Sequence, residues 1–211
     1  MTGTDRSRLA DLMVEAGPQA PTLDEGWSVR DLAAHLVVRE RRPDAGLALL
    51  ASGLSPALAR HAEAVRRRAA RQPFEELVAR FRAGPPRWSP LALPGAEAAV
   101  NAVEFFVHGE DVNRAREGWQ PQPLRPGQRE ALWKALRRQS RLLYRRSPVG
   151  VVLAVPAGPR AVALRRPVSV VVTGQPEELV LHAFGRRSVA RVEVTGPPQA
   201  VRALAQAPLS V

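Results

Sequence analysis

The sequence predicts an α-helical bundle followed by a small α+β domain, and two observations lead to this fold class. Between residues 4 and 146, apolar residues recur at helical spacing, and Pro- and Gly-rich stretches separate the segments. After Ser147, short Val-rich runs bounded by Gly and Pro are typical of strands. We therefore expect one domain over residues 1–147 and a second over residues 148–211.

Two helices are expected at the N-terminus. The first runs from Thr4 to Ala16 and stops at Gly17-Pro18, a pair that terminates helices. The second follows Ser28, an expected N-cap with Asp31 three residues later, and ends before Pro43. The expected core positions of both helices are Leu9, Leu12, Met13, Ala16, Leu32, Ala33, Leu36 and Val37.

The next helical segments are shorter. An apolar piece around Leu47 to Leu50 precedes Ser55-Pro56, where Ser can cap a helix that extends to Arg71. We expect this helix and the Phe74 to Phe81 segment to form one bent unit, because Pro73 interrupts the pattern.

Two long helices complete the expected bundle. A loop rich in Pro and Gly, Gly84 to Gly95, leads into a helix over Ala96 to Arg116. A further helix spans about Gln128 to Arg146, with expected core contacts at Leu132, Leu136, Leu142 and Leu143. Four main helices suffice for a bundle, and bundle cores often hold metals between facing helices.

The C-terminal segment alternates short strands with helices. Strands are expected over residues 149–156, 161–164, 168–173 and 190–195, and helices over residues 176–184 and 198–205. This β-β-β-α-β-α order predicts an α+β domain.

Composition excludes several function classes. The 211 residues include no cysteine, so thiolate metal sites and a cysteine nucleophile are excluded, and thiol chemistry needs an external thiol. No secretory signal or membrane span is recognisable, so we expect a cytoplasmic protein without a membrane partner. The formal charge of +11 comes almost entirely from dispersed Arg, which favours solvated helix faces over nucleic-acid binding. A polyanionic partner and an anionic small substrate are the alternatives.

Ionisable residues fall on the apolar stripe of the helix that begins at Ala96. At about 100° per residue, an arc of roughly 140° contains Val100, Val103, Glu104, Val107, His108 and Asp111. The ionisable members should point inward, where unpaired burial is costly. A divalent metal removes that cost, because Glu and His four residues apart present an oxygen and a nitrogen from adjacent turns. The alternatives are a core histidine hydrogen-bonded to a carboxylate, or a helix whose solvent-facing side is the one assigned here to the core.

A third candidate ligand lies on another helix. His35 is three residues from Leu32 and borders the apolar stripe of its helix. Together with Glu104 and His108 it makes a three-ligand site with an open position, whereas structural zinc sites usually close all four. The candidate metal ligands are therefore His35, Glu104 and His108.

The remaining polar candidates are weaker. Asp111 is a candidate fourth ligand, or a catalytic residue that orients His108 or relays a proton. Glu40, Glu110 and His182 are expected on the surface. His61, between Leu58 and Val65, is also expected there, with an approach to the site as the alternative.

Three stretches carry a family resemblance: GWSVRDLAAHLVVRERRPD (26–44), NAVEFFVHGEDVNRA (101–115) and ELVLHAFGRRSVARVEVTGPPQAV (178–201). They resemble the mycothiol-dependent maleylpyruvate isomerase family, within the wider DinB-like metal-binding bundles, and especially an uncharacterised metal-binding branch. The resemblance implies a DinB-like four-helix bundle with a C-terminal α+β domain. It also implies a divalent metal, commonly zinc, held by His35, Glu104 and His108.

The resemblance further implies a thiol cofactor, mycothiol, that binds the metal and is held partly by the C-terminal domain. Arg186, in the FGRR segment, sits where such enzymes often carry a Gly-Arg and is the candidate cofactor contact. A surface arginine after a helix is an equally good interpretation. Where relatives carry a cysteine near Asp24, this chain has TLDEGW, and a packing role at that position is favoured.

The leading hypothesis is a metal- and mycothiol-dependent isomerase or thiol transferase that acts on a small-molecule electrophile. One alternative is a non-catalytic, metal-dependent binding or regulatory module. Another is a metal-dependent hydrolase with water as the nucleophile. The sequence does not distinguish an isomerase from a transferase, and it does not indicate the oligomeric state.

Overall fold

The computed structural model describes residues 2–42, 44, 55–89 and 96–209, with the backbone alone for residues 2–4 and 96–100. The contacts divide the chain into two compact units, residues 1–122 and 123–211. The apolar piece expected around Leu47 to Leu50 lies outside the described residues. No helix in the described part of the chain is long and apolar enough to cross a membrane.

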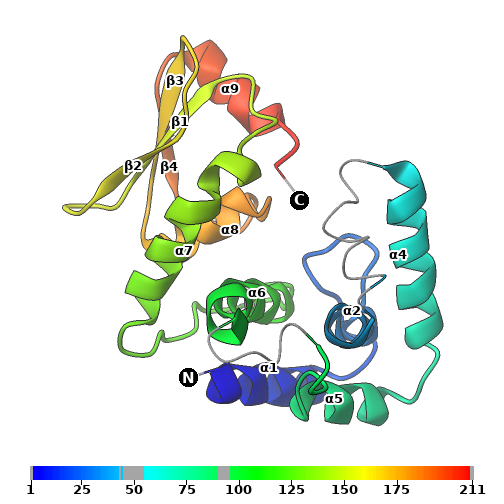
Figure 1. Cartoon of the computed structure of the whole chain (residues 1–211). Helices are drawn as coiled ribbons and strands as arrows, with labels where there is room; N and C mark the ends of the chain where they lie inside the picture. The colour runs from blue at the N-terminus through cyan, green and yellow to red at the C-terminus, as the bar shows by residue number, and fades with distance from the viewer. Residues whose placement is uncertain (1, 43, 45–54, 90–95, 210–211) are drawn as a thin grey trace. The chain divides into compact units, whose positions relative to one another are not determined.

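The first unit is helical (Figure 1). Its described helices are α1 (Thr2–Ala16), α2 (Val29–Arg41), α4 (Pro56–Ala69), α5 (Phe74–Arg82) and α6 (Ala96–Asn113). Helix α1 packs against α5 and α6, and α2 packs against α4 and α5. The bent unit expected around Pro73 is instead two separate helices, because proline cannot continue the hydrogen-bonding pattern of α4.

The core of the first unit joins α1, α2, α5 and α6. Its larger members include Leu9, Met13, Leu32, Leu36, Phe74, Leu77, Phe81 and Phe105. The core positions predicted on α1 and α2 are confirmed, with Leu12 and Ala16 partly buried at its margin. Helix α6 is buried beyond its predicted stripe, because Phe105 and Val112 also enter this core.

A capping box starts α2, as its sequence predicts. The Ser28 hydroxyl accepts a hydrogen bond from the backbone N–H of Asp31, and the Asp31 carboxylate accepts one from the N–H of Ser28 at 3.0 Å. Ser55 occupies the N-cap of α4 but makes no side-chain capping hydrogen bond. Only the first of these two predicted caps therefore uses its hydroxyl.

Two carboxylates expected on solvated faces are buried, so these predictions are wrong. Glu40 is paired with Arg6, whose Nη2 lies 2.7 Å from Oε1. Glu110 is paired with Arg114, one turn later on the chain. Burial of a charge is tolerated when a hydrogen-bonded opposite charge is buried beside it. The partner of Glu40 comes from another helix, which the pattern of α2 alone does not indicate.

The second unit combines helices with a four-stranded sheet (Figure 1). Its elements are α7 (Gln128–Leu143), β1 (Gly150–Ala154), β2 (Arg160–Leu164), β3 (Ser169–Thr173), α8 (Pro176–Ala183), β4 (Glu193–Thr195) and α9 (Pro198–Gln206). The strand order is β2-β1-β3-β4, in which β1 and β3 are parallel and the outer pairs antiparallel. The predicted order of strands and helices is confirmed.

Helix α7 belongs to the second unit, where it packs against α8 and β2. The four-helix bundle is therefore not confirmed, although a helical part followed by an α+β part is. The domain boundary predicted after residue 147 lies inside the second unit and stays a prediction.

Two side chains of the second unit differ from expectation. His182, expected on the surface, is 3% exposed, and its Nδ1 lies 2.8 Å from the hydroxyl of the fully buried Tyr144. Leu142, expected in the core, is 54% exposed, whereas the adjacent Leu143 is buried. Near the end of α7 only one of two consecutive leucines can face inward.

Candidate metal centre

The three predicted metal ligands come together between α2 and α6. One ligand atom from each of His35, Glu104 and His108 lies within 4.8 Å of the others. The centroids of the two imidazole rings are 5.2 Å apart, and Glu104 Oε1 lies 3.7 Å from His108 Nε2. His35 thus meets two residues that follow it in the sequence by 69 positions or more.

The polar ring of His35 is the unusual feature of the site. Both ring nitrogens are buried, and neither has a hydrogen-bond partner among the described residues. Leaving such a group unsatisfied costs about 1–3 kcal/mol. Burial, together with the nearby positive charge of His108, lowers the pKa of His35 to about 3. The ring is therefore neutral at neutral pH and can offer a nitrogen lone pair to a cation.

Asp111 orients His108. The His108 Nδ1 lies 3.0 Å from Asp111 Oδ2, and both side chains are buried. Because a carboxylate only accepts hydrogen bonds, the proton is on Nδ1 and Nε2 is the atom on the side of Glu104. Histidine ligands of metals commonly donate their second N–H to a carboxylate in this way.

Burial alone would lower the pKa of His108, but its contacts with Asp111 and Glu104 outweigh this and raise it to about 9. Burial likewise opposes ionisation of Glu104, yet the His108 contact and the charge of Arg39 lower its pKa to about 2. Glu104 is thus a carboxylate at neutral pH. Any cation that binds here must displace a proton from His108.

Arg39 approaches Glu104 from α2, one turn after His35. Its Nε lies 3.8 Å from Glu104 Oε1, and its Nη1 donates a hydrogen bond to Asn101 Oδ1 at 2.6 Å. The guanidinium is thereby held between two α6 side chains. Its charge stabilises the ionised form of Glu104.

Asp24 lies beside the candidate site, although the sequence favoured a packing role at this position. Asp24, His108 and Asp111 form a second group of possible metal ligands. One carboxylate oxygen of each aspartate and one ring nitrogen of His108 lie within 4.8 Å of one another. The loop before α2 is held there because the N–H of Leu23 donates to the carbonyl of Asp111 at 3.1 Å. The loop turns at Gly26, whose φ of +76° favours glycine. No local spacing rule relates this loop to α6.

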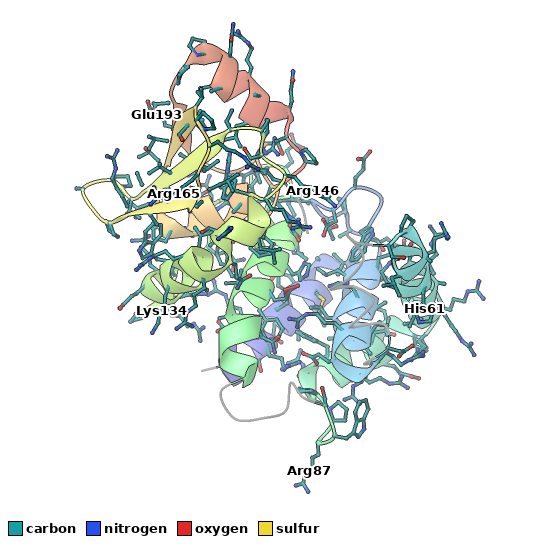
Figure 2. The ribbon with its side chains drawn as sticks, turned by 45° about the horizontal axis from the view of Figure 1, so that its top comes forward. His61, Arg87, Lys134, Arg146, Arg165 and Glu193 are labelled. Carbon is teal, nitrogen blue, oxygen red and sulfur yellow. The ribbon has the colours of Figure 1, made fainter. Side chains whose placement is uncertain are left out.

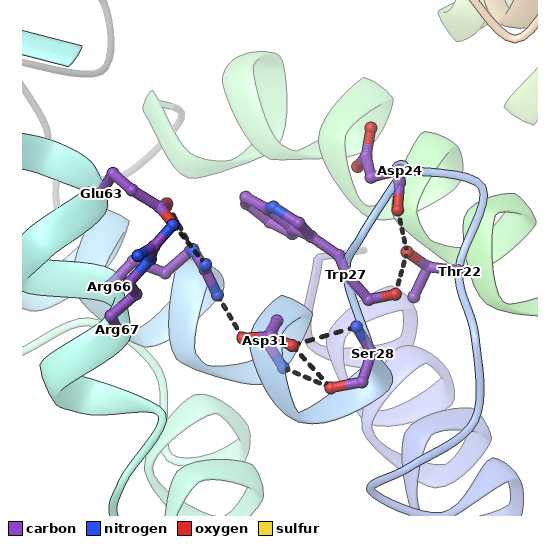
Figure 3. A network of polar contacts seen from close by, with 8 residues as sticks. All are labelled: Thr22, Asp24, Trp27, Ser28, Asp31, Glu63, Arg66 and Arg67. Atoms are coloured by element: carbon purple, nitrogen blue, oxygen red, sulfur yellow. Dashed lines mark hydrogen bonds and ion pairs between the residues drawn. The ribbon is translucent and has the colours of Figure 1, made fainter. Parts of the chain in front are cut away.

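The same loop brings Trp27 next to His35. The two rings have centroids 5.2 Å apart at an interplanar angle of 55°. The guanidinium of Arg66, from α4, lies 4.5 Å from the Trp27 ring centroid. Figure 3 shows the indole extending from the loop toward Arg66 and Glu63. The indole is thus held between an imidazole and a cation.

Two other predicted residues lie elsewhere. His61 is exposed on α4, as expected, and its Nε2 lies 3.1 Å from Asp44 Oδ2 (Figure 2). Arg186 lies in the second unit just after α8, where its Nη1 donates to the carbonyl of Phe184 at 2.8 Å. Its role as a cofactor contact stays a prediction.

The donor set suits a divalent cation that keeps an open coordination position. Two imidazoles and one carboxylate are the protein ligands of several catalytic zinc sites, which leave the fourth position to water or substrate. The nitrogens of His35, which have no hydrogen-bond partner in the part of the chain that the structure describes, fit this use, because coordination would satisfy a buried group that hydrogen bonding does not.

Comparisons with known proteins agree with the fold. No family model matches the chain, and no curated protein matches it. A crystal structure of the mycothiol-dependent maleylpyruvate isomerase is similar over 93% of both chains, with a TM-score of 0.61 and 19% identity. A variant of that enzyme with one histidine replaced by alanine is similar over the same share of both chains, with a TM-score of 0.62 and 18% identity. The chain thus has the fold of these structures.

Proposed function

We propose that this chain binds a divalent metal, zinc in the first instance, and uses an external small thiol to isomerise a small-molecule electrophile or to transfer the thiol to it. The observation that carries the proposal is the meeting of His35, Glu104 and His108 around one point, with both nitrogens of His35 lacking a partner among the described residues. The likeness in fold to a mycothiol-dependent isomerase makes mycothiol the first thiol to test.

The residues of the site have separate tasks in this proposal. His35 and Glu104 are the ligands that are ready at neutral pH, because one is neutral and the other ionised. Asp111 holds the Nδ1 proton of His108 and so directs Nε2 to the site. Trp27, whose ring centroid lies 5.2 Å from that of His35, has the task of shielding that ring from water. When bound, a divalent cation supplies the positive charge that keeps a thiol deprotonated at neutral pH.

The sulfur must come from outside, because the chain has no cysteine. A thiolate can add to an activated alkene and leave again after rotation, which is isomerisation, or displace a leaving group, which is transfer. Arg186 is the proposed contact of the thiol cofactor in the second unit.

The function is tested with purified protein loaded with zinc and incubated with mycothiol and a panel of activated alkenes and alkyl halides. We expect turnover that needs both the metal and the thiol. Turnover that needs the metal but not the thiol would instead support hydrolysis. Absence of turnover across the panel, with metal bound, would favour a non-catalytic metal-binding module.

The ligand assignment is tested separately by metal content. We expect His108→Ala to abolish stoichiometric zinc binding, because it removes the ligand that both carboxylates support. The matched control is His61→Ala, an exposed histidine of the same unit, which should keep its zinc. Elemental analysis measures the zinc content of both variants. An unchanged zinc content in His108→Ala would reject the assigned ligand set.

A further inference from the structure

A small cavity borders the candidate metal centre at His35. Its volume is about 100 Å³, and α2, α4 and Trp27 form its walls. By comparison with a cavity of roughly 150 Å³ that accommodates benzene, it has room for about four heavy atoms. The cavity is thus too small for a whole thiol cofactor but large enough for one arm of a substrate.

The walls of this cavity are mostly apolar. Helix α4 contributes Ala59 and Ala62, whose short side chains leave the space open, and α2 contributes Val38. The indole of Trp27 forms an aromatic wall and is held in place against the ring of His35. Water finds few hydrogen-bond partners in such a space, so an apolar group is favoured there.

The charges that line the cavity balance one another. Among the described lining residues, Glu63 and Arg66 carry charge at neutral pH. Arg66 Nε and Nη2 donate to the two oxygens of Glu63 at 2.8 and 2.7 Å, and its Nη1 donates to Asp31 (Figure 3). A carboxylate that entered would meet a guanidinium with two carboxylate partners already, and would lie beside Glu63. An anionic arm would therefore lose its hydration without gaining a free cation.

We propose that this cavity receives a neutral, mainly apolar arm of the electrophile, of about four heavy atoms such as a methyl ester, rather than a free carboxylate. The inference rests on the proposed function, because it names the class of substrate for that site. It predicts that the chain prefers uncharged electrophiles over the corresponding acids.

Binding is measured first, with compounds that cannot react with a thiol. Dimethyl succinate and succinate are titrated into the zinc-loaded protein by calorimetry, and each is repeated with Ala59→Leu, which fills the cavity. We expect Ala59→Leu to weaken the diester by about tenfold or more and to leave succinate unchanged. The proposal is overturned if the diester does not bind, if Ala59→Leu leaves its affinity unchanged, or if Ala59→Leu selectively weakens succinate.

Further variants keep the test informative if Ala59→Leu does not fold. Ala64→Leu, on the exposed face of the same helix, is the matched control and should bind the diester normally. Val38→Ala enlarges the cavity and should improve diethyl succinate relative to dimethyl succinate. Glu63→Gln replaces one carboxylate partner of Arg66 with a neutral amide, which removes a negative charge beside the cavity and should increase the affinity for succinate. The proposal is contradicted if Val38→Ala leaves the preference between the two esters unchanged. It is also contradicted if Glu63→Gln does not increase the affinity for succinate.

Turnover is measured second, by the isomerisation of dimethyl maleate and of maleate with mycothiol. The thiolate forms a bond to one alkene carbon, the central bond rotates, and the same thiolate leaves with its electron pair, so no oxidant or reductant is needed. We expect a larger rate enhancement over free mycothiol for the diester, and its loss in Ala59→Leu. Diester binding at the cavity without turnover would reject the proposed function alone. Turnover of maleate that exceeds that of the diester, in a protein that needs metal and thiol, would reject the cavity assignment alone.

Discussion

His108 is the residue on which the electrostatics of the site depend. Two carboxylates contact its ring, Glu104 at Nε2 and Asp111 at Nδ1, and together they hold its pKa at about 9 against the effect of burial. The same carboxylates that favour the imidazolium also favour a metal cation at Nε2. Protons and metal therefore compete for this ring.

This competition has a consequence for stability. Because the pKa of His108 is raised from 6.5 to about 9, the metal-free folded protein binds this proton more tightly than the unfolded chain does. The resulting stabilisation is complete below pH 6.5 and is lost as the pH rises through 9. We expect the free energy of unfolding of metal-free protein, from urea titrations, to fall over this window. In His108→Gln the fall should be smaller, and an equal fall in both proteins would contradict the assignment.

Asp111 can be tested without removing a ligand. Asp111→Asn keeps the shape of the side chain but replaces the carboxylate that accepts the His108 N–H. Residues that hydrogen-bond to a metal ligand typically change the metal affinity by about 10–100-fold when they are mutated, so we expect the zinc affinity to fall by that factor. Competition with a chelator measures it. Asp44→Asn, which alters the carboxylate beside the exposed His61, should bind metal normally. An equal loss of metal affinity in both variants would show that the overall loss of negative charge is the cause, and not the contact with His108.

At the scale of elements, the start of α2 positions the site. The capping box fixes the first turn of α2 and leaves His35 on the second turn, facing α6. Asp31 also accepts a hydrogen bond from Arg66 of α4, so one carboxylate both caps α2 and joins it to α4. Burial would raise the pKa of Asp31, but its contacts with Ser28 and Arg66 lower it.

The two serine caps provide a matched comparison. Ser28→Ala removes a hydroxyl that caps α2, and we expect a loss of about 1 kcal/mol in the free energy of unfolding. Ser55→Ala changes an N-cap that makes no side-chain hydrogen bond, so its stability should be nearly unchanged. Denaturant titrations of the two variants measure the difference. Equal losses would mean that the α2 cap does not stabilise the protein through its hydroxyl.

On the scale of the whole molecule, the chain forms two units, and all three candidate metal ligands lie in the first. The second unit has a buried polar pair of its own, the Tyr144 hydroxyl and His182 Nδ1, which join α7 to α8. Burial, with a smaller effect from the charge of Arg187, lowers the pKa of His182 to about 4, so the pair is neutral at neutral pH. Because both residues lie in the second unit, we expect this pair to stabilise that unit independently of the metal ligands.

Tyr144→Phe tests that separation. It leaves the buried His182 Nδ1 without the tyrosine hydroxyl, which should lower the stability of the second unit by about 1–3 kcal/mol. Zinc content should be unchanged, because the ligands lie in the first unit. Thermal unfolding and elemental analysis of the same sample give both values. Loss of zinc at a temperature where the variant remains folded would show that the two units are coupled at the site.

Apart from the break between α4 and α5, the sequence by itself determined the order of helices and strands and the inward stripe of α6, because both follow from local periodicity and from Gly and Pro at the breaks. It also indicated His35, Glu104 and His108, since ionisable residues on apolar stripes need a reason to be buried. Tertiary structure alone decided that these residues meet, that Asp24 joins His108, and that Glu40 is paired with Arg6. The physical reason is distance along the chain: helical spacing describes neighbours within one element, whereas each of these contacts joins two elements through packing.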